Sequence, residues 1–198
     1  MKRIFIFLLI ILFFLSGCAR TVTIRPKGLL KIQLEFYNPL SLYDGGNYYS
    51  LVIPFNKDGY VSNDLSTWQY FIWCDGDRDI LNFKWGKNGD LSTLQLFSLI
   101  HAQLKGEISE DKTTLIFQIP LIVFGGSLSK LYMKIYLYKI LGSPSYIQGL
   151  ADLLWSVPQE DIYQEDIYID LTNPISGKVF YEKYSLNQAV SYIKVWLE

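Results

Sequence analysis

The chain is poor in the residues on which many enzymes and disulfide-stabilised proteins depend. It contains one histidine, His101, and two cysteines, Cys18 and Cys74. A Ser-His-Asp triad needs an imidazole as its base, and no nucleophile-elbow motif supports His101, so we expect no catalytic residue of this kind. Charge is also nearly balanced, with 18 basic and 19 acidic residues. This balance argues against a nucleic-acid partner, which would favour a clustered basic surface.

The N-terminal apolar run is too short for a transmembrane helix. Met1-Lys2-Arg3 precedes an uninterrupted apolar run from Ile4 to Leu15, whereas a span needs roughly 20 apolar residues. A basic start, a short apolar run and a group of small residues are typical of a secretory signal peptide. We therefore predict that residues 1–17 are a signal peptide.

The end of this segment, Leu15-Ser16-Gly17-Cys18, resembles the lipobox of bacterial lipoproteins. The resemblance implies cleavage between Gly17 and Cys18 and transfer of a diacylglyceryl group to the Cys18 thiol. It also implies acylation of the new amino terminus by a fatty acid such as palmitate. Two or more chains suit the physics, because one fatty chain anchors a protein only marginally. Ala19 follows the cysteine, which in a diderm host favours the outer membrane, with the domain on its periplasmic face.

The predicted mature chain consists of a tether and one domain. Residues 18–28 form the lipidated tether, whose residues up to Lys27 reach about 30 Å when fully extended. Residues 29–198 form the domain, which is long enough for a proper core. With Cys18 committed to lipid, Cys74 has no disulfide partner, and its apolar neighbours favour a buried, inert thiol over a reactive one.

Alternating apolar and polar residues predict a mainly β domain. From Leu29 to Tyr37 the apolar residues recur at every second position, which is typical of a strand with one wet face. Further strands are expected at 48–55, 67–74, 80–85, 91–104 (one strand or two), 113–119 and 130–140, with turns between them. The turn from Gly86 to Asp90, which contains Asn88 and Gly89, predicts a hairpin. Short strands at this spacing predict an antiparallel β-sandwich.

The part from about 145 to 198 has apolar residues at helical spacing. Ile147, Leu150, Leu154 and Val157 predict a helix that begins at Ser145 and ends before Pro158. Ser185 to Gln188 has the form of a capping box and predicts a second helix, whose apolar stripe contains Leu186, Val190, Ile193 and Leu197. Two short strands, 167–171 and 178–184, are expected between them.

The strand from Lys130 to Tyr138 carries the candidate ligand-binding residues. Its apolar positions face one way, and Tyr132, Lys134, Tyr136 and Tyr138 face the other. An outward row of tyrosine and lysine side chains would suit stacking on sugar rings or docking of a partner. The alternative is ordinary packing of this row beneath the C-terminal helices.

Two acidic groups are weaker candidates. Asp75, Asp77 and Asp79 begin like a calcium loop, but Ile80 and Gly86 replace the required glycine and glutamate. A solvated turn is the simpler interpretation, and a different calcium loop, aided by Asn63 or Asp64, is the alternative. The acids of residues 160–166 (Glu160, Asp161, Glu165 and Asp166) would suit a glycosidase only if two of them were fixed about 5–9.5 Å apart. They lie in a duplicated segment, 159–168, which favours a surface loop.

Three segments, 48–55, 67–74 and 112–120, resemble in order and rhythm the strands of DOMON-like and related carbohydrate-binding β-sandwiches. The resemblance covers roughly residues 48–140 and rests on no diagnostic motif. It implies sugar binding through exposed tryptophans, here Trp68, Trp73 or Trp85. Haem-binding relatives use a methionine and a histidine, but Met133 falls on the predicted apolar face, so we expect no cofactor.

Together these patterns predict a lipid-anchored envelope protein that acts as a non-catalytic binding or assembly module. Its expected partners are the membrane, through the anchor, and an envelope protein or glycan. Two alternatives remain open from the sequence: an envelope hydrolase that acts on glycans through the carboxylates, and a purely structural lipoprotein within a larger complex.

Overall fold

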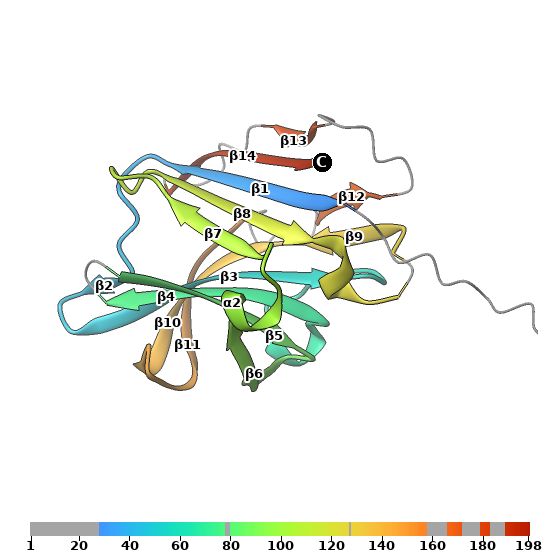
Figure 1. Cartoon of the computed structure of the whole chain (residues 1–198). Coiled ribbons are helices and arrows are strands. Elements are labelled where there is room, and N and C mark those ends of the chain that lie inside the picture. Colours follow the sequence, from blue (N-terminus) through green and yellow to red (C-terminus); the bar gives the residue numbers. More distant parts are fainter. Residues whose placement is uncertain (1–27, 78–79, 127, 158–165, 172–178, 183–188) are drawn as a thin grey trace, which may run out of the picture.

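A computed structural model describes residues 28–77, 80–126, 128–157, 166–171, 179–182 and 189–198. These residues form two antiparallel sheets, stacked as two layers in the manner of a β-sandwich (Figure 1). The mainly β, antiparallel prediction is confirmed. The predicted signal peptide, the Cys18 lipidation site and the tether up to residue 27 lie outside the described residues.

The smaller sheet has five strands and is built around the strand predicted from the clearest alternation. Its order is β13 (Val179–Glu182), β14 (Val190–Leu197), β1 (Leu29–Phe36), β8 (Thr114–Pro120) and β7 (Lys105–Ile108). Every second side chain of β1 is buried, because successive side chains of a strand point to opposite faces of the sheet.

The larger sheet has nine strands. Its main path is β11 (Tyr146–Val157), β10 (Ile135–Ser143), β3 (Asn47–Asn56), β4 (Tyr70–Asp77), β5 (Ile80–Lys87) and β6 (Asp90–Leu96). The short strand β2 (Tyr43–Asp44) pairs with β3, and β9 (Lys130–Met133) pairs with both β3 and β12 (Ile167–Asp170).

The centre of the larger sheet is buried on both faces. The face toward the smaller sheet contributes Ile53, Ile72 and Ile135 to an apolar core shared by the two sheets, which we call the inner cluster. The opposite face carries a second group of buried side chains, the outer cluster: Val52, Val61, Trp68, Phe71, Trp73, Tyr136, Tyr138 and Ile140. The central strand β3 is therefore almost entirely apolar, as a strand covered on both faces must be.

Pro54 explains why β9 and β10 are two strands rather than the single strand predicted over 130–140. Phe55 pairs with Met133 and Val52 pairs with Tyr136, so the same register places Lys134 opposite Pro54. Proline has no N–H to donate to the ladder. The pairing is interrupted there, and Lys134 lies between the two strands.

The prediction of two C-terminal helices is wrong, because the two segments are strands with β-bulges. In β14, Phe36 pairs with Val190 while Glu35 pairs with Tyr192, so one extra residue separates Val190 from Ile193. A bulge turns the two-residue period into a three-residue step, which imitates helical spacing. The predicted capping box at Ser185 lies outside the described residues.

The segment predicted as the first C-terminal helix is β11, and it shows the same effect. Its pairing with β10 shifts register at three places. Leu150 pairs with Ile140 and Leu153 pairs with Tyr138, so three residues on β11 face two on β10. Both leucines pack on the outer cluster. Ser145 lies in the turn between the two strands and caps no helix.

The stretch 91–104 contains one strand followed by a single helical turn. After β6 comes α2 (Phe97–Ile100), which buries Phe97. The predicted hairpin before β6 is confirmed, and its turn residues Asn88 and Gly89 both have positive φ angles, of 55° and 59°. Such angles are typical of the tight turns that join antiparallel strands. Two short 3-10 helices are also present, η1 (Leu65–Thr67) and η2 (Leu121–Phe124).

Candidate functional site

The predicted row of Tyr132, Lys134, Tyr136 and Tyr138 lies on the outer face of the larger sheet, but most of it is buried. Lys134 and Tyr136 are fully buried, Tyr138 is nearly so, and only Tyr132 is partly exposed. The structure thus places three of the four residues within the protein. The interpretation of the row as packing therefore holds for Tyr136 and Tyr138, although their cover is not the pair of C-terminal helices that was predicted.

The cover is the segment that connects β3 to β4. Trp68 stacks on Tyr136 with 5.9 Å between the ring centroids. The hydroxyl of Tyr138 donates to the backbone oxygen of Asn63 at 3.0 Å, and that of Tyr136 lies 3.4 Å from the backbone oxygen of Val61. Buried tyrosine hydroxyls need such partners, so these two tyrosines hold the connecting segment on the sheet.

Lys134 is the centre of a buried polar group at one edge of this cover. Its Nζ lies 3.5 Å from Oδ1 of Asp166 and 3.2 Å from the hydroxyl of Tyr60, and it sits 4.4 Å from the centroid of the Tyr60 ring. Asp166 Oδ2 accepts a hydrogen bond of 2.6 Å from the backbone N–H of Val61. Burial of a charge is costly unless it is paired and hydrogen-bonded, and this arrangement supplies both conditions.

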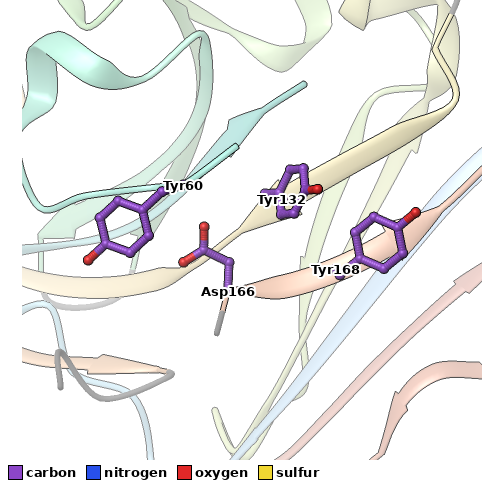
Figure 2. Close-up of a pocket in the computed structure, with 4 residues that line it drawn as sticks. All are labelled: Tyr60, Tyr132, Asp166 and Tyr168. Atoms are coloured by element: carbon purple, nitrogen blue, oxygen red, sulfur yellow. The ribbon is translucent and has the colours of Figure 1, made fainter. Parts of the chain in front are cut away.

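An open pocket lies over this group. It has a volume of about 500 Å³ and is lined by Tyr60, Tyr132, Asp166 and Tyr168. Figure 2 shows the three tyrosine rings arranged around the Asp166 carboxylate. Tyr60 is 59% exposed and Tyr168 48% exposed. We call this the tyrosine pocket.

The walls of the tyrosine pocket come from three separate parts of the chain. Tyr60 belongs to the β3–β4 connection, Tyr132 to β9 and Tyr168 to β12. Pairing of β9 with β12 sets Tyr132 directly opposite Tyr168, with 5.3 Å between the ring centroids. The ammonium of Lys130 lies 5.5 Å from the centroid of the Tyr132 ring. The pocket therefore offers ring faces, phenolic hydroxyls and a nearby cation.

The size and the described lining of the tyrosine pocket resemble those of small-ligand sites. The volume falls within the range of about 300–1,000 Å³ that is usual for small-ligand sites, which combine apolar walls with a few polar groups. Among the described residues, Asp166 is the only carboxylate that lines the pocket, and it contacts Val61 and Lys134. A glycosidase would need a second carboxylate across the ligand. Glu160, Asp161 and Glu165 lie outside the described residues.

The other acidic candidate, Asp75, does not lie in a solvated turn. It is fully buried on the outer face of β4, where Oδ2 accepts hydrogen bonds from Trp73 Nε1 at 2.8 Å and from Lys84 Nζ at 2.6 Å. Asp79 lies outside the described residues, and so does the side chain of Asp77. No group of three or more metal-binding side chains occurs among the residues that are described.

The histidine, methionine and remaining cysteine lie apart from the tyrosine pocket. Met133 belongs to the inner cluster, as its predicted apolar face required. His101 ends α2, and its Nδ1 accepts a hydrogen bond of 3.1 Å from the backbone N–H of Gln103. Cys74 is fully buried, as predicted, and desolvation by burial raises the pKa of its thiol far above the ordinary value.

The three tryptophans that the carbohydrate-binding resemblance singled out are not exposed. Trp68 and Trp73 belong to the outer cluster and Trp85 to the inner cluster, and all three are buried. They contribute packing instead of an exposed platform. The exposed aromatic residues of the site, Tyr60 and Tyr168, were not singled out in the sequence. The only signal for Tyr60 was its place directly after the turn at Gly59.

No protein-family model, curated protein or solved structure matches the chain. Within the described ranges, no helix has the length and apolar character that crossing a membrane requires. The resemblance to carbohydrate-binding β-sandwiches and the resemblance of residues 15–18 to a lipobox therefore stay predictions from the sequence.

Proposed function

We propose that this protein is a lipid-anchored envelope protein whose tyrosine pocket binds a glycan without catalysing its hydrolysis. The observation that carries the binding role is the pocket itself, because it presents exposed tyrosines around buried polar partners. Tyrosine rings offer a flat apolar face with a hydroxyl at the tip. This combination suits a pyranose ring, which has apolar C–H faces and a rim of hydroxyl groups.

The polar floor of the pocket supports a preformed site. Lys134 and Asp166 are almost completely buried and hold Tyr60 and Val61 by contacts of 3.5 Å or less. Groups that are fixed before the ligand arrives lose little freedom when it binds, and this lowers the cost of association. The same fixed contacts keep the Asp166 carboxylate from acting as a free base.

The anchor is proposed from the sequence. Lipid on Cys18 would hold the domain at the cell envelope, and Ala19 favours the outer membrane in a diderm host. A glycan binder at that position would act on surface polymers or on the glycan part of an envelope assembly. The mass of the native N-terminal peptide tests this directly: we expect a chain that begins at Cys18 and carries fatty acids. A chain that still begins at Met1 would refute the anchor.

The binding role is tested with an array of envelope glycans and with calorimetry on the best ligand. Tyr60→Ala and Tyr168→Ala should each weaken binding at least tenfold, because stacking and a hydroxyl contact are lost together; a tenfold loss corresponds to about 1.4 kcal/mol. Tyr37→Ala is the matched control, since Tyr37 is similarly exposed but does not line the pocket. Unchanged affinity in both pocket variants would exclude this site.

A further inference from the structure

Hydrogen bonds fix the position of Gly28, the first described residue after the tether. Leu121 N–H donates to the backbone oxygen of Gly28 at 3.0 Å, and Leu29 N–H donates to that of Glu198 at 2.8 Å. Gly28 has a φ of +133°, and a Cβ there would lie 3.1 Å from the Glu198 backbone oxygen. The first described residue is therefore held beside the start of η2 and the last residue of the chain.

The tyrosine pocket is linked to this exit point by a short series of contacts. The four residues of η2 span less than about 10 Å at about 2 Å per residue and lead to Gly125. The ammonium of Lys57 donates to the backbone oxygen of Gly125 at 3.0 Å. Only Asp58 and Gly59 separate Lys57 from Tyr60 in the sequence. In Figure 1 the start of β1, the C-terminus, β9 and β12 all lie at the right-hand end.

The surface at this end has apolar, tyrosine and lysine side chains. Ile122 on η2 is 39% exposed, and Tyr60 and Tyr168 are exposed at the tyrosine pocket. Gly125 and Gly126 add exposed backbone without side chains. We call the surface made by Lys57, Tyr60, Ile122 and Tyr168 the tether end.

The described charged groups at and beside the tether end are of both signs. Lys57 and Lys130 contribute ammonium groups, and the Asp166 carboxylate of the pocket is paired with the buried Lys134. The Glu198 carboxylate beside Gly28 is paired with Lys31 at 2.8 Å, while Asp58 is an exposed acid of the neighbouring loop. Tyrosine is enriched at membrane–water interfaces, and lysine stems reach from apolar surfaces to the headgroups.

We propose that the tether end lies against the lipid surface, so that the tyrosine pocket receives a glycan presented at the membrane. This inference rests on the proposed anchor at Cys18. Residues 19–27 reach about 30 Å at most, which keeps Gly28 near the bilayer. The tether alone leaves the domain free to rotate. Insertion of Ile122 and the tyrosines at headgroup depth selects one orientation.

The test uses the full, natively lipidated protein in vesicles of phosphatidylethanolamine and phosphatidylglycerol. A nitroxide label is attached in Ile122→Cys and, as the matched control, in Leu141→Cys. Leu141 is 50% exposed near the tip of the β10–β11 hairpin, away from the C-terminus in Figure 1. Cys74 is buried with a raised thiol pKa, so it should stay unlabelled. Tyr60→Cys provides a second position at the tether end.

Collisions with oxygen, which concentrates in lipid, and with a water-soluble nickel chelate report the depth of each label. We expect labels at 122 and 60 to favour oxygen and to be shielded from nickel, and the label at 141 to show the reverse. Equal access to nickel at all three positions would refute the orientation while leaving the anchor intact. A protein that does not float with vesicles would refute the anchor and, with it, this inference.

Discussion

At the centre of the larger sheet both faces are buried, but they are buried in different ways. The inner cluster is apolar and is covered by a second sheet, which brings together strands such as β1, β8 and β14. The outer cluster is covered by the segment that connects β3 to β4, and Ile147, Leu150 and Leu153 of β11 pack against it. It includes tyrosine hydroxyls and lies beside two charge pairs, Lys84–Asp75 and Lys134–Asp166.

The difference indicates how one sheet can serve stability and binding together. Apolar burial is non-directional and scales with the area removed from water, so the inner face stabilises the fold with little demand on geometry. Buried polar groups require specific partners. On the outer face these partners fix the β3–β4 connection, which carries Tyr60 to the edge where Tyr132 and Tyr168 complete the pocket.

The largest effect is expected from truncation on the inner face. Phe117 is fully buried and lies 5.7 Å, between ring centroids, from Phe83. Phe117→Ala should lower the free energy of unfolding by about 3–5 kcal/mol, because apolar contacts are lost and a cavity remains. Urea denaturation measures the change, and Phe117→Leu should cost less than Phe117→Ala, because more of the buried volume is kept. Similar small losses in both variants would argue against a tightly packed inner cluster.

A slightly smaller but more diagnostic effect is expected on the outer face. Lys134→Met removes the ammonium beside the buried Asp166 carboxylate and should destabilise the protein by about 3 kcal/mol. Adding Asp166→Asn should recover most of this loss, because the amide oxygen can still accept the Val61 N–H. Thermal and urea unfolding of the single and double variants give the coupling energy. Strictly additive losses would show that the pair is not energetically linked.

Removal of a single hydroxyl on the outer face should destabilise the protein about a third as much as Lys134→Met. Tyr138→Phe deletes the hydrogen bond to Asn63 and should cost about 1 kcal/mol. The control is Tyr37→Phe, which changes an exposed ring and should cost less than about 0.5 kcal/mol. If the two variants unfold at the same urea concentration, the hydroxyl of Tyr138 does not hold the connecting segment.

The smallest effect concerns an exposed carboxylate, which contrasts with the buried pairs. Hydrogen bonds from Ser109 and Thr113 lower the pKa of Asp111 from 3.8. The unfolded chain therefore binds this proton more readily, so the contribution to stability is present above pH 4 and is lost as the pH falls through the folded-state pKa. Asp111→Asn should reduce stability slightly at pH 7 and by less at pH 2. An equal loss at both pH values would point to a cause other than ionisation.

The sequence predicted the fold best where strands are regular. Leu29–Phe36 alternates without interruption and was correctly predicted, and the Asn88-Gly89 turn was equally clear. β11 and β14 were mistaken for helices because bulges gave their apolar residues a three-residue spacing. Val190, Ile193 and Val195 of β14 are β-branched and favour a strand, which agrees with the structure better than the helical spacing does.

The candidate site was predicted only in part, for a different reason. Alternation along 130–138 correctly placed Tyr132, Lys134, Tyr136 and Tyr138 on one face, but alternation says nothing about what covers that face. The cover begins more than sixty residues earlier in the chain, and the long-range pairing of β9 with β12 brings Tyr168 opposite Tyr132. Such encounters depend on the complete topology and leave no local pattern.

The most direct test of the binding claim is an NMR titration of the protein, with labelled tyrosine rings, against fragments of its host's envelope glycans. The account predicts that the resonances of Tyr60, Tyr132 and Tyr168 shift together and saturate with one affinity, while those of the exposed Tyr37 and Tyr146 stay in place. Ligand-induced shifts that fall elsewhere, or none with any fragment at millimolar concentration, which corresponds to about −4 kcal/mol, would contradict it.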